Sequence, residues 1–266
     1  MERNRKICNL CDFGQMGKWY GVMNLTVEDL KKWQPDHISE DHVDNLILRL
    51  AEEIKFLHLV YYNPPHGSWK TINLVHNGKE YRQVGPKRGV GNLRRPDLAF
   101  QDIRSGKTVR LFLIESKLSP SSWDRNMPKE MKAYFEGITG FNESKGIRQV
   151  PFRHSRKIGT VKWEEIKEEN QDRDWFRNIE PEYLYGFAYS LGRKRKGIDL
   201  SSEKRKIERM IAEDQQNLFP IVVMAVGWTE EDFSPFILRN YSSLFPKDLR
   251  EPLEATFSKF KLDAPF

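Results

Sequence analysis

The chain has 266 residues, of which 38% are hydrophobic and 12% aromatic, enough to build a sizeable core, so an intrinsically disordered protein is excluded. Charged residues make up 31%, and the net charge of +6 suits a polyanionic partner. No apolar run reaches the roughly eighteen to twenty residues of a membrane span, and no apolar stretch follows the charged start as in a secretory signal, so we expect a cytoplasmic protein without membrane contact.

Residues 1–38 are expected to form an N-terminal segment, separate from a main domain over 39–266. The two cysteines, Cys8 and Cys11, are too few for a disulfide framework. Their Cys-x2-Cys spacing, followed by His37 and His42, suits a structural Zn²⁺ site that clips this segment onto the main domain. The alternative is two reduced surface thiols and two ordinary histidines.

An amphipathic helix is predicted after Ser39, which is a good N-cap residue. Its apolar positions recur at helical spacing: Val43, Leu46, Ile47, Leu50, Ile54 and Leu57. Glu53 falls on this stripe, so we expect its carboxylate to face inward. A surface ion pair between Glu53 and Lys55 or Arg49 is an equally good interpretation.

A β-hairpin is predicted over residues 69–84, because Asn77-Gly78 is a strong turn signal between two strand-like runs. It reads as an insertion that extends the sheet toward a substrate cleft. The glycine-rich run 85–95 then carries four candidate phosphate-binding residues: Lys87, Arg88, Arg94 and Arg95. The alternative is a solvated basic turn.

A second hairpin is predicted from the strands 97–103 and 108–118, with Ser105-Gly106 as the turn. This turn would place Asp97 opposite Ile114, one register step from Glu115. The second strand is apolar on both faces, which is typical of a buried central strand. Glu115 and Lys117 would therefore lie at the end of a core element, where charge needs a compensating partner such as a metal ion.

Pro96-Asp97, seventeen intervening residues and Glu115-x-Lys117 resemble the signature of the PD-(D/E)xK nuclease superfamily. The resemblance implies Mg²⁺-dependent hydrolysis of phosphodiester bonds. Asp97 and Glu115 would hold the metal together with the carbonyl oxygen of residue 114 or 116, and Lys117 would orient or deprotonate the attacking water. It also implies a third acid on the preceding helix, for which Glu53 is the candidate. The alternative is an exposed strand end with an incidental Glu and Lys pair.

The rest of the chain alternates between predicted helices and strands. A helix from about Asn126 ends near Gly140, a polar insertion spans 146–182, a strand covers 184–191, Ser202 caps a helix, and a buried strand covers 220–228. Arg193, Lys194 and Arg195 are a second candidate DNA-binding cluster. This order predicts an α/β fold with a mixed central β-sheet flanked by helices, the core that the resemblance implies (restriction-endonuclease-like).

The resemblance is strongest to a type II restriction endonuclease, which implies a homodimer that cuts double-stranded DNA at a specific site and a cognate DNA methyltransferase as genetic partner. The two DNA strands run in opposite directions, and each subunit has one active site. A two-fold symmetric dimer would therefore place one active site on each strand. The alternatives are a repair, recombination or modification-dependent nuclease, a zinc-containing DNA-binding protein without catalysis, and an RNA-processing or RNA-binding factor.

Overall fold

A six-stranded sheet forms the centre of the computed structural model, which describes residues 40–62, 71–76, 79–84, 95–104, 108–139, 149–154, 157–162, 181–193, 199–216, 219–229, 235–260 and 262. The strands of this sheet are β1 (Leu57–Tyr62), β4 (Leu98–Asp102), β5 (Val109–Lys117), β8 (Pro181–Arg193), β9 (Ile221–Trp228) and β10 (Pro235–Tyr241). The helices are α3 (Glu40–Glu52), α4 (Met127–Thr139), α5 (Leu200–Gln215) and α6 (Lys247–Lys259), with a short 3-10 helix over Pro120–Ser122. None of these helices is long and apolar enough to cross a membrane.

The sheet is open and mixed, with the strand order β1-β4-β5-β8-β9-β10. Its middle strands β5, β8 and β9 run parallel, whereas the pairs β1/β4, β4/β5 and β9/β10 are antiparallel. Two further hairpins form separate two-stranded sheets, β2 (Thr71–His76) with β3 (Lys79–Val84) and β6 (Gln149–His154) with β7 (Lys157–Lys162). The predicted α/β class with a mixed central sheet is confirmed.

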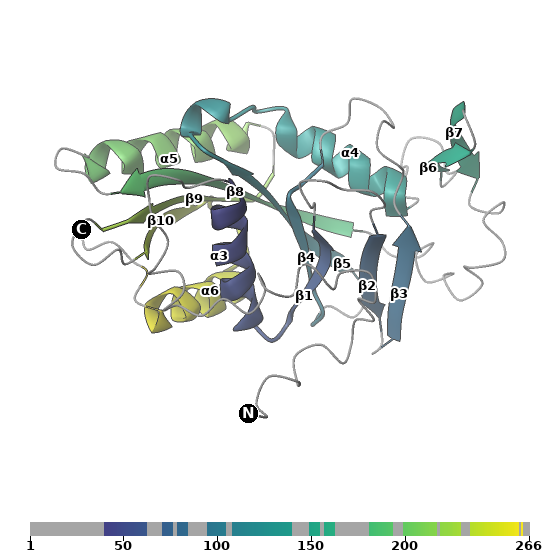
Figure 1. The fold of residues 1–266 in the computed structure, drawn as a ribbon, viewed down its shortest axis with the longest axis horizontal. Helices are drawn as coiled ribbons and strands as arrows, with labels where there is room; N and C mark the ends of the chain where they lie inside the picture. Colours follow the sequence, from purple (N-terminus) through teal and green to yellow (C-terminus); the bar gives the residue numbers. More distant parts are fainter. Residues whose placement is uncertain are drawn as a thin grey trace.

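Helices cover both faces of the sheet (Figure 1). Residues Val109, Leu111 and Leu113 of β5 belong to the core that includes α4 and α5. Phe112 and Ile114, which alternate with them, belong to the core that includes α3 and α6. The prediction that this strand is buried on both faces is therefore confirmed.

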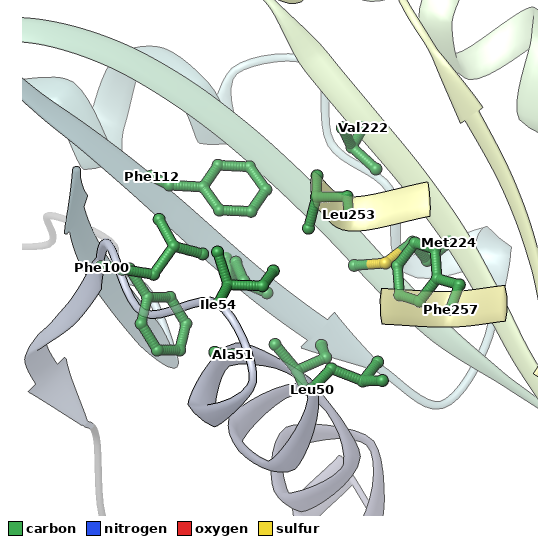
Figure 2. Close-up of a pocket in the computed structure, with 12 residues that line it drawn as sticks. Leu50, Ala51, Ile54, Phe100, Phe112, Val222, Met224, Leu253 and Phe257 are labelled. Carbon is green, nitrogen blue, oxygen red and sulfur yellow. The ribbon is translucent and has the colours of Figure 1, made fainter. Parts of the chain in front are cut away.

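A small apolar cavity lies between α3, α6 and the sheet (Figure 2). Its volume is about 30 Å³, room for only one or two water-sized molecules, and its walls are apolar. It is lined by Ile47, Leu50, Ala51, Ile54, Leu57, Phe100, Phe112, Ile114, Val222, Met224, Leu253 and Phe257. Because it offers neither polar partners nor space for a substrate, we treat it as a packing defect of the core.

An ion-pair network joins the sheet to α6 at the end where β4 finishes and β5 begins. The buried carboxylate of Asp102 accepts hydrogen bonds from Arg104, the shortest at 2.7 Å, and lies 3.5 Å from Arg110. Both arginines also reach Asp248 at the start of α6, at 3.1 and 2.9 Å. The two guanidinium groups thereby compensate the buried charge of Asp102.

Helix α3 is shorter than predicted, because it ends at Glu52 and β1 begins at Leu57. The last turn closes with hydrogen bonds from the amides of Glu53 and Ile54 to the carbonyls of Leu50 and Ala51, three residues earlier. Leu57, which the periodicity assigned to the helix, is thus the first residue of an edge strand. An apolar residue fits either element, so helical spacing alone could not locate this boundary.

Three other parts of the chain differ from the prediction: the start of α5, the region 146–182 and the residues after β9. Helix α5 starts after Asp199, whose carboxylate accepts a hydrogen bond from the amide of Ser201 at 3.0 Å, so Ser202 is not the cap. The insertion 146–182 contains the hairpin β6–β7. Strand β10 and helix α6 were not predicted.

Candidate active site

The register of β4 and β5 brings Asp97 to Glu115. Leu98 pairs with Ile114, so Asp97, directly before β4, falls opposite Glu115. The predicted register was wrong by one residue. Asp102 pairs with Arg110, so the connection between these paired residues has an odd number of residues. A hairpin with a two-residue turn has an even number of residues between any two paired positions, so the turn predicted at Ser105-Gly106 does not fit this pairing. Because directly opposed residues share a face of the sheet, the correction places both carboxylates on the same face.

Lys117 completes this cluster. Its ammonium contacts Glu115 Oε1, lies 3.9 Å from Asp97 Oδ2 and donates a hydrogen bond of 3.0 Å to the carbonyl of Ser116. The Ser116 amide donates to Asp97 Oδ2 at 2.8 Å and holds that carboxylate against the end of β5. The structure therefore brings together the three residues of the sequence signature, at the carboxyl end of a central strand.

The electrostatics of the cluster are dominated by burial. Glu115 is only 5% exposed, and burial, assisted by the negative charge of Asp97, raises its pKa to about 8 against the opposing effect of Lys117. Burial by itself would lower the pKa of Lys117, but the carboxylates of Glu115 and Asp97 outweigh it, so the pKa of Lys117 is raised. The cluster thus strongly favours a bound cation or proton.

A further acid, Asp44 on α3, lies beside these residues. Its side chain is 4% exposed, and burial, followed by the negative charge of Asp97, raises its pKa to about 8. The nearby Ser116 hydroxyl opposes this rise, although it makes no hydrogen bond of regular geometry. Glu40, four residues earlier on the same helix, also acts on Glu115 and Lys117. The amino-terminal end of α3 therefore faces the site.

Glu53, the predicted helical acid, does not reach the site. It pairs with Arg49 at 3.2 Å and with Lys259 of α6, and the hydrogen bond from Lys259 is the main reason its pKa is lowered. It lies nine positions after Asp44, which corresponds to about 14 Å along a helix. The surface-pair interpretation, with Arg49 as partner, matches the structure.

Sequence reasoning missed Asp44 and also Tyr62, the last residue of β1. Burial raises the pKa of Tyr62 to about 12, with contributions from Asp44, Asp41 and Asp97, so the phenol lies beside the acidic cluster and stays protonated. Asp44 did carry a signal, since it precedes Ile47 and Leu48 by three and four residues on a predicted helix. Its relation to Asp97 depends on how α3 lies on the sheet, which spacing does not show.

The donor set suits Mg²⁺ with few protein ligands. Among the residues that the structure describes, no three His, Cys, Asp or Glu side chains form a group that could hold a metal ion. Mg²⁺ is however commonly bound by one or two carboxylates plus water and substrate phosphate. Glu115 Oε2 and Asp44 Oδ1 are buried and have no hydrogen-bond partner among the described residues, so each can accept a cation. The carbonyls of Ile114 and Ser116 each already accept one hydrogen bond, from the Asp97 amide and from Lys117 Nζ, and each keeps a second lone pair for a cation.

The other predicted site residues fall mostly outside the described parts of the chain. This holds for Cys8, Cys11 and His37 of the zinc prediction and for Lys87, Arg88, Arg94, Lys194 and Arg195 of the DNA-binding prediction. His42 lies half-buried in the first turn of α3, and burial, opposed by Asp41, lowers its pKa. Arg95 is half-buried next to Pro96, and Arg193 is the last residue of β8.

Two carboxylates, an ammonium and a backbone carbonyl thus meet at the end of a buried strand, with a third carboxylate on the adjoining helix. This arrangement can bind a hard cation and place a positive charge next to it. It offers no cysteine thiolate or serine and histidine pair for covalent catalysis among the residues described at the site. Comparison of the chain with protein-family models, with curated proteins and with solved structures finds no match.

Proposed function

We propose that the protein is a Mg²⁺-dependent nuclease that hydrolyses phosphodiester bonds in double-stranded DNA. The observation that carries this proposal is the meeting of Asp97, Glu115 and Lys117 at the carboxyl end of β5, where Glu115 Oε2 is buried and has no hydrogen-bond partner among the described residues. Buried carboxylates are costly unless cations compensate them, and one ammonium, that of Lys117, faces the two carboxylates of Glu115 and Asp97, so a bound metal ion would supply further positive charge.

Each residue of the cluster has a task in this proposal. Asp97, Glu115 and the carbonyl of Ile114 or Ser116 would hold the metal ion, which when bound polarises the scissile phosphate and lowers the pKa of a water ligand. Lys117, positioned by Glu115, orients the attacking water and offsets the charge that develops on the phosphate oxygens. The Ser116 amide keeps the Asp97 carboxylate in place through its hydrogen bond.

Within the nucleases, we propose that the protein has a restriction-endonuclease-like core. We propose that it is most similar to a type II restriction endonuclease and acts as a homodimer. The sequence signature supports it, and so does the position of the acids at the ends of neighbouring strands in a mixed sheet covered by helices. The net charge of +6 suits a polyanionic substrate.

Incubation of the protein with plasmid DNA and Mg²⁺ tests the proposal. Discrete fragments are expected from a site-specific enzyme, and a smear would indicate a nonspecific nuclease. Asp97→Asn keeps an oxygen that accepts from the Ser116 amide but removes the charge, so cutting should fall by at least about 100-fold. Glu182→Gln, at the opposite end of the parallel strand β8, is the matched control and should cut normally. The proposal is wrong if the wild type does not cut, or if Asp97→Asn cuts at the wild-type rate.

A further inference from the structure

We propose that the hairpin β2–β3 is an arm that binds the nucleic-acid backbone, and that Gln101 fixes this arm to strand β4 of the candidate site. The inference rests on the proposed function for its choice of partner, a DNA duplex. Its support comes from the charge distribution of the chain and from the contacts that dock the hairpin on the sheet.

The positive charge of the chain is concentrated around this hairpin. Residues 70–95 contain seven of the 44 Lys and Arg residues but one of the 38 Asp and Glu residues, a net charge of +6. This equals the net charge of the whole chain, and the remaining residues carry 37 charges of each sign. A segment with this excess attracts a polyanion within about a Debye length, whereas the charges of the other residues sum to zero. The hairpin itself carries Lys79 and Arg82 against Glu80, and the other cations of the segment flank it in the sequence.

Gln101 holds the hairpin by a pair of hydrogen bonds that imitates strand pairing. Its side-chain oxygen accepts from the Val75 amide at 2.8 Å, and its side-chain nitrogen donates to the Val75 carbonyl at 2.7 Å. Gln101 is 3% exposed, so these bonds are shielded from competing water. One amide side chain thus satisfies both backbone groups of a residue in β2.

Leu74 adds an apolar contact next to these hydrogen bonds. Its side chain is fully buried and belongs to the same core as Val60 and Tyr61 of β1. The hairpin is therefore docked beside the edge strand of the sheet, where Figure 1 shows β2 and β3 next to β1. A two-stranded ribbon needs such support, because an isolated hairpin is marginally stable in water.

The docking places the hairpin on the strand that begins at the candidate site. Gln101 and Asp97 lie four residues apart, about 13 Å along an extended strand. Only residues 85–94 separate the end of β3 from Arg95, which directly precedes Pro96-Asp97. A two-stranded ribbon has the dimensions that enter the major groove of DNA, so a duplex can contact the arm and the site together.

Binding measured without divalent metal tests the arm separately from catalysis. The probe is a short DNA duplex titrated at several salt concentrations and followed by fluorescence anisotropy. Replacing Lys79 and Arg82 of β3 by glutamine should lower the slope of log affinity against log salt by about 2, because each cation releases about one counterion. Lys247→Gln with Lys259→Gln on α6 makes the same change of net charge and should leave the slope unchanged. Equal effects of both double variants, or no effect of the first, overturn the inference.

Gln101→Met tests the docking, because methionine has a similar length but cannot form either hydrogen bond. We expect faster trypsin cleavage after Lys79 and Arg82 and a reduced salt slope. Gln215→Met is the control, since this exposed glutamine also donates a hydrogen bond, to Ser243 Oγ at 3.4 Å, but lies on α5. Unchanged proteolysis and binding in Gln101→Met would overturn the role of Gln101. If the wild type binds through the arm but does not cut plasmid DNA with Mg²⁺, the nuclease proposal fails while the arm stands.

Discussion

Asp214 on α5 gives a quantitative prediction about stability. Its side chain is 0% exposed, and neither carboxylate oxygen has a hydrogen-bond partner among the described residues. Burial raises the pKa of Asp214 to about 7 from the ordinary 3.8. An acid in this environment destabilises the folded protein whenever it is ionised.

The sign and size follow from proton linkage. The folded state binds the proton more tightly than the unfolded state, so the stability associated with this proton is present below about pH 4 and is lost as the pH rises to about 7. A difference of about 3 pKa units corresponds to at most about 4 kcal/mol. Asp214→Asn removes the charge but leaves a buried amide that costs about 1–3 kcal/mol. We therefore expect a net gain of about 2 kcal/mol at pH 8 and a net loss of about 2 kcal/mol at pH 4, where the wild-type carboxyl group is protonated.

Thermal unfolding between pH 4 and pH 9 measures this effect. At pH 8 the melting temperature of Asp214→Asn should exceed that of the wild type by about 4–8 °C. Asp199→Asn is the control on the same helix, because asparagine caps a helix as well as aspartate and the site is exposed. If the melting temperature of Asp214→Asn depends on pH in the same way as that of the wild type, the pKa of Asp214 is not raised in the folded protein. The prediction would then be refuted.

Three further predictions concern the site, the cavity and the ion-pair network. Asp44→Asn should slow DNA cutting by about 10–100-fold while Glu53→Gln leaves the rate unchanged, and equal rates in a plasmid assay would exclude Asp44 from the site. Val222→Ile adds a methylene next to the cavity and should stabilise by up to about 0.8 kcal/mol. Val223→Ile, on the close-packed opposite face, should cost about 1–3 kcal/mol, and urea unfolding that ranks the two variants in reverse contradicts the cavity assignment. Asp102→Ala should destabilise by about 1–3 kcal/mol, because two arginines lose the hydrogen bonds to their buried partner but keep Asp248, and no measurable loss in the same assay would show that the network is not needed.

The sequence by itself was sufficient for features that depend on neighbouring residues along the chain. Alternating or continuous apolar runs identified β5 and β9, helical spacing identified α4, and Asn77-Gly78 identified the hairpin of β2 and β3. Glu115 and Lys117 follow an apolar run that predicts a buried strand, so the sequence also identified them as candidate site residues. These signals are local, because side-chain alternation and turn chemistry act within a few residues.

Only the tertiary structure decided which groups meet across the chain. The register that sets Asp97 opposite Glu115 depends on one residue in the connection, and a shift by one moves a side chain to the other face. Asp44 lies on α3 and Glu53 directly follows the helix, but the way α3 lies on the sheet turns its amino-terminal end toward the site. The bond between Gln101 and β2 likewise joins residues 26 positions apart. Such contacts are selected by the packing of whole elements, for which the spacing of residues within one element carries no information.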